Sequence, residues 1–274
     1  MRYLDNELFL YSSEENIDLY CHKGLENENY KEIQSISYDK LKSSNKGLNL
    51  EDIKFNNGLH VLFKTRTLKH RNERLKATLG IKRLGTYIRS VAAIDNHIKL
   101  LDCQYIPKIL GYGYVYGRLR LTKKVLIITE FKENTYNLKE FIEKFPNRIE
   151  KALDISFTMI KGHLNNGFIH LDLWMGNIIV NEELTQAWLI DLEYLKFNPK
   201  RSLEEKLGFC LGYFFSKKLS LLINEEKYLI CLNCWLDKNF TGNTLQKIKE
   251  NTIFFIKNTT TRKERMDFFN KGYN

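Results

Sequence analysis

The sequence has 274 residues, of which 43% are hydrophobic and 13% aromatic. This length and composition exclude an intrinsically disordered chain and suit one large domain or two lobes around a cleft. Lys and Arg number 43 against 33 Asp and Glu, which gives a net charge of +10. Such a surplus favours anionic partners such as nucleotides, phosphorylated glycans, nucleic acid or an acidic membrane face, with a well-solvated basic protein as an equal alternative.

Export and membrane insertion are not expected from this sequence. No stretch approaches the roughly 18 apolar residues of a transmembrane helix, and the N-terminus lacks the long apolar core of a signal peptide. The 5 cysteines are odd in number, which is typical of reduced thiols in a cytosolic protein. Cys231 and Cys234 form a single pair in an apolar, helix-like stretch, so core packing is favoured over zinc binding.

The N-terminal part of the chain has mainly strand signals. Asn56-Asn57-Gly58 has the composition of a two-residue hairpin turn, because asparagine and glycine tolerate positive φ. This turn would join a strand at 48–55 to another at 59–67. Alternating or β-branched residues between polar turns predict further short strands at 9–11, 17–20 and 33–38.

The next segments alternate between helix and strand. Residues 69–101 favour helix, and strand signals return at 105–113 and 124–129. Asn137 has the position of an N-cap for a short helix that Pro146 ends.

The C-terminal part of the chain is mainly helical. Residues 148–165 place apolar side chains at three- and four-residue spacings, which predicts an amphipathic helix that stops at Gly167. Two short apolar strands follow at 178–180 and 187–190, and from residue 202 onward the pattern is helical. A strand-rich first part and a helix-rich second part predict an α+β protein with two lobes that meet near 130–134.

One segment concentrates the polar residues that could carry chemistry. His170, Asp172 and Asn177 lie in His-Leu-Asp-Leu-Trp-Met-Gly-Asn, and Asp191 ends an apolar strand in Leu-Ile-Asp-Leu-Glu. Phosphoryl transfer needs an acceptor hydroxyl held in line and a divalent metal on the nucleotide phosphates. Mg²⁺ prefers oxygen ligands, so these side chains, on two loops at the mouth of one hairpin, could meet both needs. The alternative is that each is a turn or cap residue.

The His-x-Asp-x4-Asn and Ile-Asp-x-Glu motifs resemble those of protein-kinase-like phosphotransferases. Within that superfamily, the chain most resembles the bacterial lipopolysaccharide core kinases, which phosphorylate heptose or Kdo. The likeness runs from about residue 59 to residue 211 and includes Phe63-Lys-Thr-Arg66, Leu110-Gly-Tyr-Gly113 and Leu126-Ile-Ile-Thr-Glu130. It implies an antiparallel-sheet N-lobe that binds nucleotide, at 1–131, and a mainly helical C-lobe that carries the catalytic loops, at 132–274.

The resemblance implies a role for each polar residue of the two loops. Asp172 would orient the acceptor hydroxyl and accept its proton, and Asn177 and Asp191 would hold Mg²⁺. His170 would brace the catalytic loop, and Glu193 would add a metal contact.

The resemblance also implies an ATP site in the N-lobe. Lys64 would contact the α- and β-phosphates, although Arg66 lies on the same face of the strand and could also reach them. The backbone near Glu130 and Phe131 would meet the adenine. A solvated charge on an edge strand is the alternative for Lys64.

Two parts of that ATP site are poorly marked in the sequence. The expected glycine-rich phosphate loop is represented only by Ser43-Ser-Asn-Lys-Gly47, so Gly47 is its one glycine. For the helical carboxylate that would pair with Lys64, Asp95 is favoured and Glu73 is an alternative.

Three departures from the protein-kinase pattern argue against a protein substrate. Leu171 stands where many protein kinases have arginine, so control by phosphorylation of an activation loop is not expected. Leu192-Glu193 follows the metal aspartate in place of Phe-Gly, as is usual among small-molecule and sugar kinases. No Ala-Pro-Glu element comes after it.

Two segments are strongly basic. Residues 64–89 contain nine Lys or Arg and one acidic residue, Glu73. A cationic face there would attract a phosphorylated acceptor in an anionic leaflet, and a solvated helix without a ligand is the alternative. The tail at 257–271, with Arg262-Lys-Glu-Arg265, is ambiguous in the same way. No nucleic-acid-reading motif is present, so nucleic acid is not an expected partner.

These features predict an ATP- and Mg²⁺-dependent kinase acting on a sugar hydroxyl, of heptose or Kdo, in the lipopolysaccharide inner core. Such an enzyme would be cytoplasmic and peripheral at the inner face of the bacterial inner membrane. A soluble kinase of the choline or aminoglycoside type is one alternative, because it shares the Gly176-Asn177 and Asp191-x-Glu193 features. A nucleotide-binding pseudokinase is the other.

Overall fold

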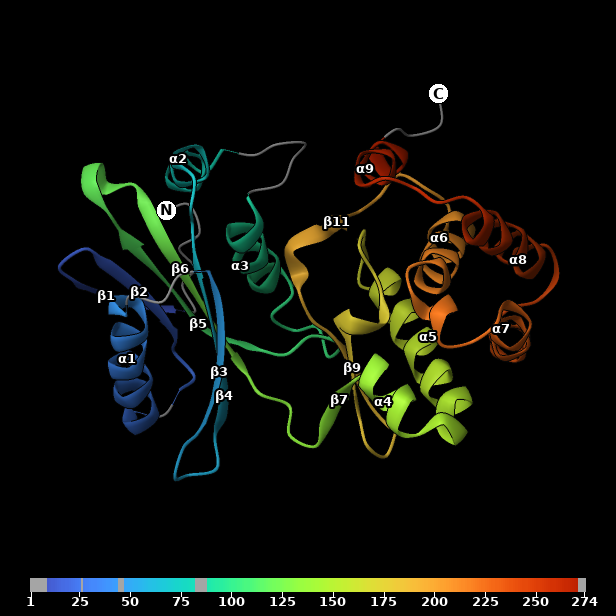
Figure 1. The fold of residues 1–274 in the computed structure, drawn as a ribbon, viewed down its shortest axis with the longest axis horizontal. Coiled ribbons are helices and arrows are strands. Elements are labelled where there is room, and N and C mark those ends of the chain that lie inside the picture. Colours follow the sequence, from blue (N-terminus) through green and yellow to red (C-terminus); the bar gives the residue numbers. More distant parts are fainter. Residues whose placement is uncertain (1–8, 26, 44–46, 82–87, 271–274) are drawn as a thin grey trace. The chain divides into compact units, whose positions relative to one another are not determined.

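A computed structural model describes residues 9–25, 27–43, 47–81 and 88–270. The chain forms two compact units (Figure 1). The first comprises Met1–Asp102 and Pro107–Glu133, and the second comprises Cys103–Ile106 and Asn134–Asn274.

The first unit is built on a six-stranded antiparallel sheet with the strand order β1-β2-β5-β6-β4-β3 (Figure 1). Its strands are β1 (Phe9–Glu14), β2 (Ile17–His22), β3 (Leu48–Lys54), β4 (His60–Thr67), β5 (Ile109–Tyr116) and β6 (Thr122–Glu130). Its helices are α1 (Asn27–Lys42), α2 (Arg71–Leu79) and α3 (Arg89–Lys99), with a short 3-10 turn at Arg118–Arg120.

Each face of this sheet has its own apolar core. Ile33 and Leu41 of α1 pack with Phe63 and Leu126 on one face. Val91 of α3 and Ala77 of α2 pack on the other face with Val125, Ile127 and their neighbours. The period-2 alternation of β4 and β6 therefore decides which of their side chains meet α1 and which meet α2 and α3.

The position of the turn predicted at 56–58 is confirmed, but the loop has three residues and not two, because the N–H of Phe55 donates to Leu59 O at 2.8 Å. Gly58 has φ +87°, its N–H donates to Phe55 O at 3.0 Å, and Asn57 Oδ1 accepts from the N–H of Leu59 at 3.1 Å. Lys54 and His60 face one another across the hairpin. Local turn chemistry thus fixes the register of β3 and β4.

The strand predicted at 33–38 is wrong, because these residues lie inside α1. Ile33, Ser37 and Leu41 are buried at four-residue spacing, which is the period of a helix lying on a sheet. Lys124, itself 4% exposed, ends this helix: its Nζ donates to Lys40 O at 2.7 Å and to Ser43 O at 3.0 Å. A cation from β6 thereby satisfies carbonyls at the C-terminus of α1.

The second unit is mainly helical. Its helices are α4 (Leu138–Lys144), α5 (Ile149–Asn165), α6 (Leu203–Ser216), α7 (Glu225–Asn239), α8 (Gly242–Lys257) and α9 (Arg262–Asn270). Its strands are β7 (Thr135–Asn137), β8 (Phe168–His170), β9 (Ile178–Asn181), β10 (Ala187–Leu189) and β11 (Leu195–Phe197). They form two small sheets, of order β10-β9-β7 and β11-β8. Short 3-10 turns lie at Pro146–Arg148, Met175–Asn177, Leu192–Tyr194 and Leu219–Leu221.

Several local predictions for this unit are confirmed. Asn137 caps α4 by accepting from the N–H of Glu140 at 3.0 Å, and Pro146 begins the turn after it. The amphipathic helix is α5, and Gly167 follows it with φ +76°. The pairing of β8 with β11 was not predicted, because three-residue strands have too few residues to show a period.

Helices α6 and α8 pack closely because α6 carries glycines on the shared face. A Cβ added to Gly208 would lie 2.3 Å from Asn251 Cβ, and one added to Gly212 would lie 2.5 Å from Thr252 O. On α7, the apolar face is formed by Tyr228, Leu232, Trp235 and Leu236. Cys231 is half-buried and Cys234 exposed, so the prediction of core packing is wrong for Cys234, which lies off that face.

The segment Cys103–Ile106 belongs to the second unit although its neighbours on both sides belong to the first. Tyr105 O accepts a hydrogen bond from Leu189 N–H at 2.8 Å, and its ring lies against His163 with centroids 5.7 Å apart. The prediction of a single boundary near residue 131 did not assign this segment to the second unit, because its placement depends on contacts with residues distant in sequence. In the part of the chain that the structure describes, no helix is long and apolar enough to cross a membrane.

Candidate active site

The paired strands β8 and β11 deliver the His-Leu-Asp segment. His170 stands opposite Leu195 in this pair, and the N–H of Leu171 donates to Tyr194 O at 2.8 Å. Leu171 is 1% exposed, so a buried apolar side chain anchors the loop. Asp172 is the first residue of the segment whose side chain reaches partly into solvent, at 23% exposure.

His170 connects the loop of Asp172 to the loop of Asp191. Its Nδ1 accepts from the N–H of Asp172 at 3.1 Å, so the ring proton must lie on Nε2, which donates to Asp191 O at 3.2 Å. Burial lowers the pKa of His170 and outweighs the opposing effects of Asp191 and Asp172. The imidazole is therefore neutral near pH 7 and serves as a bracket between the two loops.

Asn177 is fixed beside the same two loops. Its Nδ2 donates to Asp172 O at 3.0 Å, and its own backbone carbonyl accepts from the N–H of Ile190 at 2.9 Å. Because the amide nitrogen is engaged, the Oδ1 atom is the part of the side chain suited to a cation. Asp191 follows Ile190 in the left-handed region, at φ 60° and ψ 56°, a conformation that aspartate tolerates better than most residues.

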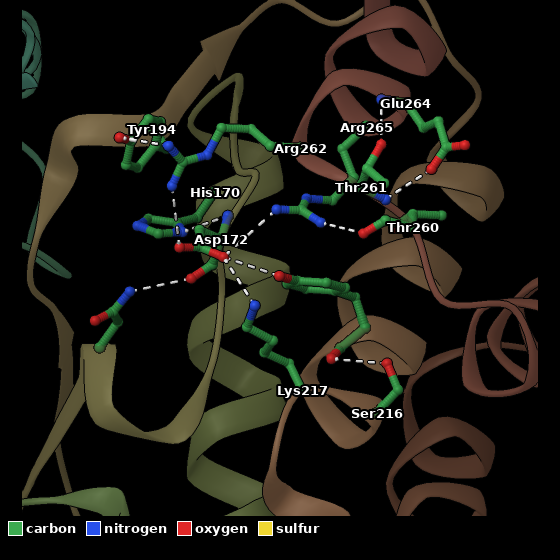
Figure 2. A network of polar contacts seen from close by, with 12 residues as sticks. His170, Asp172, Tyr194, Ser216, Lys217, Thr260, Thr261, Arg262, Glu264 and Arg265 are labelled. Carbon is green, nitrogen blue, oxygen red and sulfur yellow. Dashed lines mark hydrogen bonds and ion pairs between the residues drawn. The ribbon is translucent and has the colours of Figure 1, made fainter. Parts of the chain in front are cut away.

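The carboxylate of Asp172 is surrounded by one hydroxyl and three cations, shown in Figure 2. Tyr213 OH donates to Asp172 Oδ1 at 2.8 Å. Arg265 Nη2 lies 3.5 Å and Lys217 Nζ 3.7 Å from Oδ1, and Arg262 Nη2 lies 3.7 Å from Oδ2. These groups come from α6, α9 and the residue that ends α6.

These neighbours control the ionisation of Asp172. Partial burial alone would raise the pKa of its carboxyl, but the hydrogen bond from Tyr213 and the charges of Lys217 and Arg265 outweigh it, so the pKa is lowered. Burial raises the pKa of Tyr213, which keeps its phenol protonated as the donor. Asp172 is thus an ionised, oriented acceptor at neutral pH, which is what a group that holds an acceptor hydroxyl requires.

The predicted metal ligands supply hard oxygen donors. Asn177 is 7% exposed and Glu193 is also 7% exposed, and Asp191 lies one residue beyond the backbone bond that joins the two loops. An amide oxygen and a carboxylate fit Mg²⁺, which completes its shell with water and phosphate oxygens. Among the described residues, no group of three or more His, Cys, Asp and Glu is suited to holding a metal ion.

The predicted ATP-contacting residues lie in the first unit. Lys64 and Arg66 face Ile127 and Val125 across the β4–β6 pair, so both project toward the side covered by α2 and α3, as the strand period predicts. Burial, together with the charge of Lys64, lowers the pKa of His97 on α3 to about 3.

Asp95 and Glu73, the two carboxylates considered for Lys64, occupy different helices. Asp95 lies on α3, two residues before His97, and its Oδ2 accepts from Lys99 Nζ at 2.6 Å. Glu73 lies in the first turn of α2. The pairing of Lys64 with Asp95 stays a prediction.

The segment predicted to meet the adenine has part of its backbone engaged in the sheet. The N–H of Glu130 donates to Lys108 O and that of Phe131 donates to His60 O, each at 2.9 Å. Any backbone donor to an adenine must therefore come from beyond Phe131. Gly47 has φ +94° and accepts from the N–H of Thr67 at 3.0 Å, while residues 44–46 of the predicted phosphate loop lie outside the described residues.

The basic segment after Lys64 contributes to a cavity of about 690 Å³ in the first unit. Arg74 is held by a hydrogen bond from its Nε to Leu68 O at 2.8 Å. The cationic residues that line the cavity are Lys42, Lys69, Arg74, Lys123 and Lys124. Residues 82–87 of this segment lie outside the described residues.

Sequence reasoning missed Tyr213 and Lys217 as neighbours of Asp172. The sequence marks these two positions only as an aromatic and a basic residue in a helical segment, and most helices contain such residues. Arg262 and Arg265 were recognised as a basic pair, and their three-residue spacing puts them on one face of a helix. Nothing in the sequence indicates that this face meets Asp172.

No protein-family model matches this chain, and no curated protein matches it. The mixed α/β architecture, with an antiparallel sheet in the N-terminal region and helices in the C-terminal part, rests on the structure alone.

Proposed function

We propose that the chain is an ATP-dependent kinase with a protein-kinase-like fold that transfers a phosphoryl group to an alcohol. The observation that carries this proposal is the pair of hydrogen bonds made by His170, which connects the Asp172 loop to the Asp191 loop. Asn177 is in turn hydrogen-bonded to the backbone carbonyl of Asp172. Three oxygen-bearing side chains are thereby held on two adjacent loops. Such an arrangement suits phosphoryl transfer, where catalysis is mainly positioning and charge stabilisation.

In this proposal each residue has one task. Asp172 holds the acceptor hydroxyl in line and takes its proton, which its lowered pKa allows because the carboxylate form predominates at neutral pH. Asn177 and Asp191 would hold Mg²⁺, which supplies charge neutralisation at the phosphates. Lys64 would contact the α- and β-phosphates of ATP.

The acceptor that we propose is a sugar hydroxyl, of heptose or Kdo, in the lipopolysaccharide inner core, reached at the cytoplasmic face of the inner membrane. The cations around Asp172 support an anionic acceptor of this type. The same cations disfavour the choline and aminoglycoside alternative, because a cationic acceptor would have to approach Lys217, Arg262 and Arg265.

The test is phosphoryl transfer to defined acceptors. Purified protein, ATP and Mg²⁺ should convert dephosphorylated core oligosaccharide to its phosphorylated form and leave choline and aminoglycosides unmodified, with products identified by mass spectrometry. Asp172→Asn should lower kcat by about 10²–10⁴-fold. Asp154→Asn, an exposed carboxylate on α5, is the matched control and should retain wild-type activity.

Three results would contradict parts of this proposal. Wild-type turnover by Asp172→Asn would refute the role of the carboxylate. Transfer to an amino alcohol or antibiotic and not to the oligosaccharide would favour the small-molecule kinase. Binding of Mg-ATP without turnover on any acceptor class would favour a pseudokinase.

A further inference from the structure

We propose that Lys217, Arg262 and Arg265 form an oxyanion-binding site beside Asp172, and that this site takes a phosphate or carboxylate group carried by the acceptor molecule. The assignment of the bound group to an acceptor rests on the proposed kinase function. The oxyanion site itself follows from the charges and contacts around Asp172 and can be tested without turnover.

The positive charge of the cluster exceeds what Asp172 needs. Three cations lie within 3.7 Å of a single carboxylate (Figure 2). Glu264, on the same helix as the two arginines, accepts from the N–H of Thr261 at 2.7 Å and also interacts electrostatically with Arg265. Counting Asp172 and Glu264 against the three cations still leaves one positive charge among these five side chains.

The three cations are also too far from Asp172 to form short hydrogen bonds with its carboxylate. Their nitrogen–oxygen distances are 3.5 to 3.7 Å, whereas charge-assisted hydrogen bonds between nitrogen and oxygen are about 2.7–2.9 Å long. The short contact to the carboxylate is the 2.8 Å hydrogen bond from Tyr213. Lys217 and Arg262, with side chains 41% and 48% exposed, can therefore donate to a second oxyanion from solvent.

Arg265 provides the buried part of the site. Its side chain is 5% exposed, its Nη1 donates to Thr260 O at 2.5 Å, and its guanidinium lies over the Tyr213 ring, 4.5 Å from the centroid. Within the described residues, its Nε has no hydrogen-bond partner, and neither has the buried Oγ1 of Thr260. Burying a guanidinium is costly unless an anion compensates it, so a second anion would stabilise this arrangement.

The site is organised before any ligand binds. Thr261 and Glu264 form a reciprocal cap at the start of α9, which sets Arg262 and Arg265 one turn apart on the same face. The guanidinium of Arg262 lies over Tyr194, with its Cζ 3.6 Å from the ring centroid, and its Nη1 donates to the tyrosine hydroxyl at 2.7 Å. Phe269 anchors the other end of α9 against Phe209 of α6, with centroids 4.9 Å apart. The two arginines therefore have little side-chain entropy left to lose on binding.

Inorganic phosphate is the probe for the test, titrated by calorimetry into the nucleotide-free, full-length protein. Saturable binding is expected, and Arg262→Ala and Lys217→Ala should each weaken it by about tenfold, the loss of one charge-assisted contact. Lys263→Ala removes the same charge from the next, exposed position of α9 and should change the affinity by less than about twofold.

The substitution Asp172→Asn should have the opposite effect on phosphate affinity. It removes the anion that competes for the three cations, so phosphate should bind more tightly than to the wild type. A parallel titration with acetate distinguishes the source of the group: tighter binding of phosphate assigns a phosphorylated acceptor, and tighter binding of acetate assigns a carboxylated one.

Three outcomes would overturn the proposal. The first is no saturable binding of either anion, and the second is an equal loss in Arg262→Ala and Lys263→Ala, which would indicate general surface charge. The third is binding that is abolished by Lys64→Ala and unaffected by Arg262→Ala, which would place phosphate at the ATP site. Turnover is measured separately, so an inactive protein that binds phosphate through Arg262 would refute the kinase function alone.

Discussion

Replacing Tyr213 by Phe removes one hydroxyl and leaves the aromatic ring that packs beneath Arg265. In the wild type this hydroxyl donates to Asp172 Oδ1 at 2.8 Å, and the ring is 5% exposed. The substitution therefore opens no large cavity. Its effect on stability is confined to the bond between a neutral donor and an ionised acceptor.

The cost of that substitution can be worked from the site. A hydrogen bond to a charged group contributes about 1.5–3 kcal/mol. The Asp172 side chain is 23% exposed and has Lys217 and Arg265 nearby, so water and these cations replace part of the lost bond. The free energy of unfolding should fall by about 1 kcal/mol at neutral pH, which is below that range.

The stability that Tyr213→Phe loses should depend on pH in a defined direction. The pKa of Asp172 is lowered in the folded protein, so its stabilising contribution is complete above the ordinary carboxyl value of about 3.9 and disappears as the pH falls through the lower folded value. Without the Tyr213 hydroxyl the folded pKa rises toward its ordinary value. The difference in stability between wild type and Tyr213→Phe should therefore shrink once the pH drops below about 4.

Urea unfolding of both proteins across this pH range is the assay. Tyr228→Phe is the matched control: Tyr228 is fully buried and donates at 2.7 Å to a backbone carbonyl, Leu211 O, so the penalty there should not change with pH. A penalty for Tyr213→Phe that is as constant as that of Tyr228→Phe would refute the link between the hydroxyl and the charge of Asp172.

Two further substitutions test how the units are built. Lys124→Met should lower the free energy of unfolding by about 2 kcal/mol, because it removes a buried cation that caps a helix. The control, Lys123→Met at the exposed neighbouring position, should change the free energy of unfolding by less than about 0.5 kcal/mol. Equal effects of the two substitutions would contradict the capping role. Gly212→Ala should destabilise by about 1–3 kcal/mol, because its Cβ would lie 2.5 Å from Thr252 O. The control is Gly117→Ala, where the atom nearest to the added Cβ is 3.7 Å away, and it should be neutral or stabilising by about 0.5 kcal/mol. A larger destabilisation by Gly117→Ala than by Gly212→Ala would contradict the close packing of α6 and α8. Urea unfolding measures the stability of all four variants.

The local features of the fold could be read from the sequence. The turn at 56–58, the cap at Asn137 and the helix at 149–165 depend on turn chemistry, capping and the period of apolar residues, which act over a few neighbouring positions. The two loops with Asp172 and Asp191 could also be recognised, because their residues are grouped at the ends of short apolar strands. The misassigned segment at 33–38 has β-branched residues that suit a strand, and only packing on the sheet makes it helical.

The surroundings of Asp172 were decided by the tertiary structure. Tyr213 and Lys217 lie more than 40 positions beyond Asp172 along the chain, and Arg262 and Arg265 lie 90 or more positions beyond it. They reach it only because α6 and α8 pack through glycines and Phe269 holds α9 against α6. The sequence by itself therefore indicated the residues that we propose for phosphoryl transfer. The charge around them, which sets the ionisation of Asp172, came from long-range packing that no local pattern encodes.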